Sequence, residues 1–185
     1  MTLTGDINIL PSGVRLRVRS RFPWGFQMST NRFFLRSISI FQELDESEIL
    51  IIDQIAEEGS YKAGEIVFRQ GSEGKELYII KMGEVEVIKE GSEGTSQLLT
   101  VLEAGTFFGE MSIVTEETRS ATIRALGECR LLKIQKSTID RLSETNSGII
   151  LKIYKELLRI LAERLRLTNE HYFFTKETLR RLRSM

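Results

Sequence analysis

Glycines at short intervals divide the middle of this chain into brief apolar segments. These segments are rich in β-branched and aromatic residues, and they cover 66–68, 77–81, 85–88, 98–102, 121–124 and 130–134. Gly64, Gly71, Gly83, Gly105 and Gly109 are among the glycines between them. Short strands at spacings of about 8 to 12 residues are typical of a β-sandwich or barrel. We therefore predict an α+β fold built on a β jelly-roll barrel.

Helical patterns flank the β-rich segment on both sides. Asp45 followed by Glu48 has the spacing of a capping box, and four isoleucines come directly after it. This predicts a helix from about residue 46 to 57. From Thr138 onward nearly everything is helical in pattern. The expected architecture is an N-terminal helix, the β-roll and long C-terminal helices.

The last predicted helix carries an apolar seam. Its members fall at alternating spacings of three and four, in the order Leu151, Tyr154, Leu158, Leu161, Leu165, Thr168 and Tyr172. This is the repeat of a coiled coil. Ile150 and Ile153 widen the apolar stripe, so one face can pack on the barrel while another meets a second copy. Two interpretations stay open: a helix that packs only on its own barrel, and a parallel homodimer.

Charge is segregated along the chain, although Lys and Arg balance Asp and Glu overall. Residues 1–36 carry six Arg against Asp6, a net charge of +5, and residues 152–185 carry nine basic against four acidic residues, again +5. The remaining 11 basic and 21 acidic residues give 37–151 a net charge of −10. An acidic domain repels phosphate at long range, so an anionic ligand there needs a specific pocket.

Composition excludes several classes of enzyme. Cys129 is the single cysteine and His171 the single histidine, which is too few for a tetrahedral zinc site or a supported Cys-His pair. No apolar stretch approaches the length of about 18 residues that a membrane span requires. We expect a cytoplasmic, non-catalytic protein without a membrane span. We divide it into a basic arm (1–36), a helix plus β-roll domain (37–145) and a C-terminal helical region (146–185).

One segment departs from simple strand alternation. It reads Phe-Gly-Glu-Met-Ser-Ile over residues 108–113, and Arg-Ser-Ala-Thr follows over 119–122. Gly109 permits a tight turn, and the apolar residues after it can wind into one short helical turn. Arg119 offers a planar fork to a phosphate, and Glu110 can accept a hydrogen bond from a hydroxyl. These groups match a sugar phosphate. The alternative is that Glu110 and Arg119 form only a structural ion pair.

This segment resembles the phosphate-binding cassette of the cyclic nucleotide-binding domain family. The spaced glycines and the sequences of 64–71 and 77–85 share the resemblance, which covers roughly residues 37 to 170. It implies that Glu110 holds the ribose 2′-hydroxyl and that Arg119 neutralises the cyclic phosphate. The other ligand-binding residues that it implies around the sugar phosphate are Phe108, Gly109, Met111, Ser112, Ser120 and Ala121.

The end of the last helix is similar to the dimerisation helix of bacterial catabolite activators. That resemblance implies that Thr168 and Asn169 approach the base and favours cAMP, whereas Ser120 stands where a Thr favours guanine in some relatives. Only 15 residues follow Glu170, so we expect no sequence-specific DNA binding by a helix-turn-helix domain. The ligand is expected to be cAMP, or else cGMP, with no cofactor or metal.

The segment departs from the family pattern at Glu116-Glu117-Thr118, where Gly-x-Pro is common. Two hypotheses follow. The first is a cyclic nucleotide sensor that converts binding into a shift of its C-terminal helices and changes its contact with an effector protein. The second is a degenerate cyclic nucleotide-binding fold that acts as a scaffold without ligand. Non-specific nucleic-acid binding by the basic ends, such as Arg15–Arg21, is a third interpretation.

Overall fold

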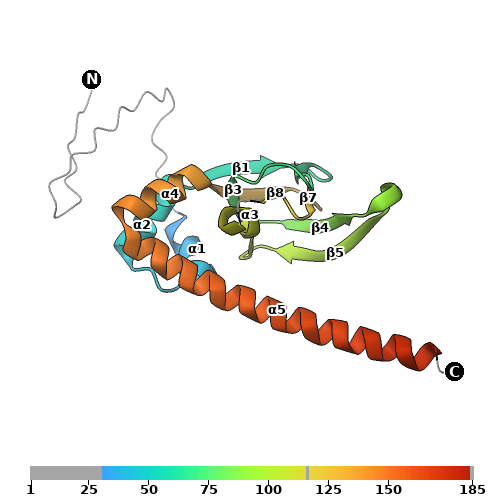
Figure 1. Cartoon of the computed structure of the whole chain (residues 1–185). Coiled ribbons are helices and arrows are strands. Elements are labelled where there is room, and N and C mark those ends of the chain that lie inside the picture. The colour runs from blue at the N-terminus through green and yellow to red at the C-terminus, as the bar shows by residue number, and fades with distance from the viewer. Residues whose placement is uncertain (1–30, 116, 184–185) are drawn as a thin grey trace, which may run out of the picture.

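The computed structural model describes residues 31–115 and 117–183, and it confirms the α+β fold (Figure 1). Within these residues eight strands form two antiparallel four-stranded sheets, in the orders β1-β8-β3-β6 and β2-β7-β4-β5. The strands are β1 (Glu57–Tyr61), β2 (Ile66–Phe68), β3 (Glu76–Met82), β4 (Glu84–Glu90), β5 (Ser96–Glu103), β6 (Phe107–Phe108), β7 (Thr122–Ala125) and β8 (Cys129–Gln135).

The pairing of the strands explains their alternating sequence. Val85 of β4 is paired with Leu102 on one side and with Ala125 on the other, and all three face the interior of the roll. Antiparallel partners point to the same face, so one inward position per strand builds an apolar layer. The turn between β3 and β4 requires glycine, because Gly83 has a φ of +86° and an added Cβ would lie 2.4 Å from the Glu128 carbonyl oxygen.

The helices gather at one end of the roll (Figure 1). They are α1 (Arg32–Ser37), the 3₁₀ turn η1 (Ser39–Phe41), α2 (Glu46–Ile55), α4 (Lys136–Thr145) and the first half of α5 (Ser147–Arg183). A second 3₁₀ turn, η2 (Ser92–Gly94), links β4 to β5, and the short helix α3 (Glu110–Thr115) lies within the roll. Apolar side chains of these end helices form one core with β3 and β8. The described part of the chain holds no helix long and apolar enough to cross a membrane.

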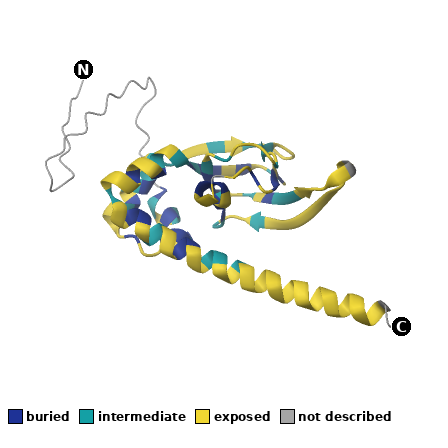
Figure 2. Ribbon diagram, viewed as in Figure 1, coloured by how far each residue is buried: buried dark blue, intermediate teal, exposed yellow. Residues whose placement is uncertain are grey.

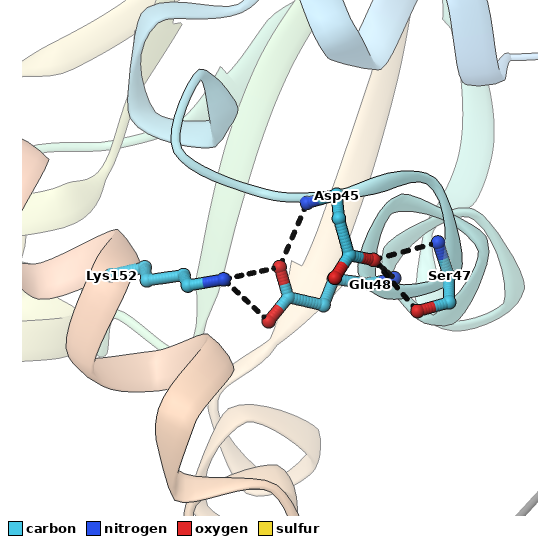
Figure 3. Close-up of polar contacts among 4 residues, drawn as sticks. All are labelled: Asp45, Ser47, Glu48 and Lys152. Atoms are coloured by element: carbon cyan, nitrogen blue, oxygen red, sulfur yellow. Dashed lines mark hydrogen bonds and ion pairs between the residues drawn. The ribbon is translucent and has the colours of Figure 1, made fainter.

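The predicted capping box is present at the start of α2 (Figure 3). The Asp45 carboxylate accepts the backbone N–H groups of Ser47 at 2.9 Å and Glu48 at 3.0 Å, and the Asp45 N–H donates to Glu48 Oε2 at 2.8 Å. Lys152 of α5 donates to both Glu48 oxygens at 2.8 Å. The cap that starts α2 therefore also anchors the beginning of α5.

Helix α5 has two differently used apolar faces. Ile149, Ile150 and Leu157 are buried against the end helices, with Ile153 and Ile160 half-buried beside them. The seam is only partly covered: Leu161 packs against the core, and Figure 2 shows the outer half of the helix as exposed. One row of the seam, with residues seven apart, is at least 51% exposed at each position, and Leu179 continues it; the row consists of Leu151, Leu158, Leu165, Tyr172 and Leu179.

Some boundaries differ from those expected. Helix α2 ends at Ile55, two residues earlier than predicted, because the chain turns extended at Ala56 and enters β1. Strands β1 and β6 were not predicted, since β1 contains Tyr61 as its only large apolar residue and β6 has two residues. Most of the predicted arm lies outside the described residues, whereas its last part enters α1, where Leu35 is buried. The three domain boundaries stay predictions.

Candidate functional site

The expected turn and short helix lie at the end of β6. Gly109 has a φ of +83°, and an added Cβ would lie 2.6 Å from Arg119 Nη1 and 2.9 Å from the Glu76 carbonyl oxygen. Neither contact leaves room for a side chain, so glycine is required here. The chain then winds into α3, whose first residue is Glu110. The turn thus places Glu110 directly after the glycine whose carbonyl accepts a hydrogen bond from Arg119.

Arg119 is buried inside the roll, with 2% of its surface exposed. Its Nη1 donates to the Gly109 carbonyl at 3.1 Å, and its Nη2 donates to the carbonyl and the carboxylate of Glu76 at 2.9 and 3.1 Å. The guanidinium lies over the ring of Phe68, 4.0 Å from the ring centre. Burial lowers the pKa of Arg119, and nearby Tyr78 and Glu76 oppose that shift. The group stays charged at neutral pH.

One donor of Arg119 has no partner. Its Nε is the single buried side-chain nitrogen or oxygen without a hydrogen bond among the residues that the structure describes. A buried N–H of a charged group without an acceptor costs free energy, and such exceptions in native proteins are commonly explained by a missing ligand or water. Arg119 therefore retains a donor for an anion after its contacts with the protein are counted.

Glu110 is also buried, at 7% exposed, but its partner comes from a distant element. Arg164 of α5 donates to Glu110 Oε1 at 2.8 Å, and the same guanidinium lies over Phe107, 5.0 Å from the ring centre. The sequence analysis did not identify Arg164. It is one turn beyond Ile160 and two turns beyond Leu157, so a cation on the body-facing row of the last helix was the signal that was available.

Glu110 and Arg119 do not pair with each other. Within the described part of the chain each has its own ion-pair partner, Arg164 and Glu76 respectively. The interpretation of the two as a merely structural ion pair is therefore wrong. The apolar cavity that Glu110 borders has a volume of about 30 Å³ and separates the roll from the end helices. That volume holds about one water molecule, so the cavity is not the nucleotide site.

The remaining cassette residues lie in α3 or close to it in the chain. Phe108 stacks on Tyr78, with ring centres 5.2 Å apart. Ser112 is buried against Gly74, where an added Cβ would lie 2.1 Å from the serine Cβ. The Ser120 hydroxyl lies 3.6 Å from the sulfur of Met111, both residues being exposed, and Ala121 is buried. Of the departing residues, Glu116 lies outside the described residues and Glu117 is exposed.

Thr168 and Asn169 lie away from the cassette along α5. Both are exposed, and the Thr168 hydroxyl donates to the carbonyl of Arg164 on its own helix at 2.8 Å. No contact joins either residue to α3 or Arg119 within the part of the chain that the structure describes. Their predicted contact with a base stays a prediction, and in the single chain it requires either a movement of α5 or a second copy.

The groups of the cassette have a chemistry that suits a small anion carrying hydroxyl groups. A buried guanidinium with an open donor suits a phosphate, and a buried carboxylate accepts hydrogen bonds from a sugar hydroxyl. Both residues adjoin Gly109, Arg119 through a hydrogen bond and Glu110 in the sequence, so the two groups match the two halves of a sugar phosphate.

Comparison with known proteins agrees with this class. The sequence profile of the Cyclic nucleotide-binding domain matches residues 58–146. The cAMP-dependent protein kinase regulatory subunit of Blastocladiella emersonii is 35% identical over 109 residues, which are 59% of this chain and 27% of that protein. The chain thus spans about a quarter of the length of this relative. Residues 58–146 are therefore identified as a cyclic nucleotide-binding domain, and the chain is related to catabolite activators and to cAMP-dependent protein kinase regulatory subunits.

Solved structures share the fold. The catabolite activator protein of Thermus thermophilus superposes with a TM-score of 0.66 at 26% identity, over 75% of this chain and 63% of that one. A cyclic nucleotide-binding domain from Methylobacillus flagellatus superposes with a TM-score of 0.69 at 20% identity, over 76% and 83% of the two chains. The second likeness shows the fold alone.

Proposed function

We propose that this chain is a cytoplasmic, non-catalytic cyclic nucleotide sensor that couples ligand binding to a rearrangement of α5. The observation that carries the proposal is the buried Arg119, whose Nε–H has no acceptor within the described residues. In the proposed complex Arg119 binds the cyclic phosphate and Glu110 accepts the ribose 2′-hydroxyl. The kinase subunits and activator proteins related to this chain are named for their response to cAMP, which supports the assignment.

The Glu110–Arg164 ion pair supplies the proposed coupling. A ribose hydroxyl that donates to Glu110 competes with the Arg164 guanidinium at 2.8 Å, and Arg164 belongs to the helix that must move. A ligand shifts such an equilibrium only by its different affinities for the two helix positions. A tenfold difference corresponds to about 1.4 kcal/mol of coupling.

The base preference is proposed to be adenine over guanine. It depends on the resemblance of Thr168 and Asn169 to catabolite activator helices, and it needs α5 to approach the roll. Titration calorimetry with cAMP and cGMP tests the function and the preference together. Micromolar or tighter cAMP binding supports both, equal binding of the two nucleotides retains the sensor without the preference, and no binding by either rejects the sensor.

A specific observation favours the second candidate, a scaffold that binds no nucleotide. Both charged groups of the site already have protein partners, since Glu76 holds Arg119 and Arg164 holds Glu110. Thermal unfolding separates the candidates, because a ligand at a hundred times its dissociation constant adds about 2.7 kcal/mol to stability. A melting temperature unchanged by cAMP, cGMP and a cyclic dinucleotide supports the scaffold.

We also propose that α5 forms a parallel homodimer along its exposed seam and presents a surface to an effector protein. The five exposed residues at heptad spacing support the dimer, because the body leaves this row of the seam uncovered although it contacts Leu161 of the other row. Native mass spectrometry tests it. The wild type should appear at twice the mass of the chain and the Leu158→Asp variant as a monomer, whereas a monomeric wild type contradicts the dimer.

A further inference from the structure

The geometry points to a set of positioning residues behind the phosphate site, which we call the rim clasp: Gln70, Glu90 and Thr122. We propose that the rim clasp holds the backbone of Arg119 and Ser120 so that the guanidinium can meet a cyclic phosphate. Its three members come from the loop after β2, the last residue of β4 and the first residue of β7, and side-chain contacts join them. The inference rests on the proposed function, since it assigns these residues to the same ligand site.

The side chain of Gln70 pairs with Glu90 as another backbone strand would. Its amide Nε2 donates to the Glu90 carbonyl at 3.0 Å, and its Oε1 accepts the Glu90 backbone N–H at 3.0 Å. An amide can fill both roles at once because it carries a donor and an acceptor side by side. Gln70 thereby fixes the loop after β2 to the last residue of β4.

The hydroxyl of Thr122 completes the clasp from β7. Its Oγ1 accepts the backbone N–H of Gln70 at 2.9 Å and donates to Glu90 Oε1 at 2.5 Å. Thr122 is buried, and its hydroxyl therefore needs these partners. A valine at this position keeps the shape and removes both hydrogen bonds, whereas a serine keeps the hydroxyl.

The clasp is continuous with the backbone that carries the guanidinium. The N–H of Arg119 donates to the Ser72 carbonyl, and the N–H of Gly71 donates to the Arg119 carbonyl, each at 2.8 Å. Lys89, the neighbour of Glu90, donates from Nζ to the Ser120 carbonyl at 2.7 Å. Residues 119–122 are thus held on one side by the loop after β2 and on the other by the end of β4.

This arrangement supplies rigidity where the local structure does not. The segment between α3 and β7 is irregular. The hydrogen bonds of the Arg119 guanidinium would by themselves fix only the end of that side chain and not its backbone. A site that binds an anion needs its donors held in the productive geometry by supporting contacts. Gln70, Glu90 and Thr122 are positioning residues in this sense, because they act through Arg119 and do not touch the ligand themselves.

Calorimetry with cAMP on the full chain provides the first arm of the test. Gln70→Ala and Thr122→Val should each weaken binding about tenfold, the equivalent of one net hydrogen bond, while Thr122→Ser stays within about twofold of wild type. Gln97→Ala, on β5 opposite Lys89, is the matched control and should not change affinity. In an Arg119→Lys background Gln70→Ala should weaken cAMP binding by less than about threefold, because the guanidinium that the clasp positions is gone.

Amide hydrogen exchange provides a second arm that needs no ligand. Gln70→Ala and Thr122→Val should accelerate exchange at the Arg119 and Gly71 amides, and Gln97→Ala should not. If the wild type binds no cyclic nucleotide, the proposed function fails and this arm still decides whether the clasp holds Arg119. Unchanged exchange in both variants overturns the clasp. An affinity loss that is equally large in the Arg119→Lys background shows a merely structural role and also overturns it.

Discussion

The two charged residues of the site are buried to a similar degree but held in different ways. Arg119 is bound by Glu76 and Gly109, which belong to the roll that surrounds it. Glu110, one residue beyond Gly109, is bound by Arg164, which lies 54 residues away on α5. The proposed phosphate half of the site is therefore held within the roll, whereas the partner of the proposed ribose half comes from helix α5.

This difference shows where regulation can enter such a fold. A group held only by residues of the roll offers little for a conformational change to act upon. A carboxylate held by a helix that packs against the roll reports the position of that helix, and by reciprocity a ligand of the carboxylate changes that position. The proposed sensor needs both kinds of residue, one for affinity and one for coupling.

The largest effect is expected at the proposed phosphate half. Arg119→Ala should lower cAMP affinity by about 2 to 5 kcal/mol, because it leaves the phosphate without its buried charge partner. Calorimetry measures the loss. Arg124→Ala is the control, since Arg124 is exposed on β7 and pairs with Glu86. Unchanged affinity in Arg119→Ala would contradict both the distinction between the two halves and the proposed sensor function.

Gly109→Ala tests the same half of the site through the backbone turn that Arg119 contacts. A φ of +83° and a Cβ placed 2.6 Å from Arg119 Nη1 should lower the free energy of unfolding by about 1 to 3 kcal/mol. Gly105→Ala has a similar φ of +89° with nothing within 4 Å of its Cβ, and should cost about 1 kcal/mol. Denaturant unfolding of both variants separates backbone strain from crowding, and equal costs would contradict the close approach at Gly109.

Arg164→Ala tests the proposed ribose half, whose partner comes from α5. Removing the competitor of the ribose should tighten cAMP binding about fivefold, roughly 1 kcal/mol, because Glu110 then gains its hydrogen bond only from the ligand. The same change should destabilise the free protein, since a buried carboxylate loses its partner. Arg166→Ala serves as the control because Arg166 pairs with Glu163 and Glu170 on its own helix. Weaker binding in Arg164→Ala would mean that the ion pair persists in the complex.

The smallest effect concerns the far anchor of α5. The hydroxyl of Ser47 and the N–H of Glu48 hold the pKa of Asp45 below its ordinary 3.8. A carboxyl whose pKa is lowered by folding stabilises the protein above its unfolded pKa, and this contribution is lost as pH falls through the folded value. Asp45→Asn keeps a capping oxygen without a charge. The stability advantage of wild type over this variant should therefore shrink between about pH 5 and pH 2.

Thermal unfolding across that range measures the advantage. A difference that stays constant with pH would show that the charge of Asp45 does not contribute to the cap. Since the cap also places Glu48 against Lys152, a change in nucleotide affinity in Asp45→Asn would indicate that this anchor of α5 is energetically coupled to the nucleotide site.

Much of this architecture was predictable from local pattern. Glycine spacing and short apolar alternations located six of the strands, and Asp45 with Glu48 located the start of α2. The turn at Gly109 with the short helix after it also followed from residue type. Each of these features depends on the conformational preferences of neighbouring residues. Strand β1 was missed because its pairing with β8, and not its own composition, makes it a strand.

The partners of the charged residues were not predictable in the same way. Glu76 and Arg164 lie 43 and 54 residues from the groups they hold, and many other acidic and basic residues stand at comparable distances. Likewise the heptad spacing on the last helix indicated a seam, but only packing showed which of its positions stay exposed and that Leu161 contacts the core.

By itself the amino-acid sequence determined the glycine-defined roll and the seam, because these follow from short-range sterics and periodicity, whereas the cassette with its two charged residues was implied by a family resemblance. Only the tertiary structure decided that Arg119 keeps an open donor and that Glu110 is held by α5. The physical reason is that burial and ion pairing depend on which surfaces meet, and meeting surfaces are a property of the whole fold.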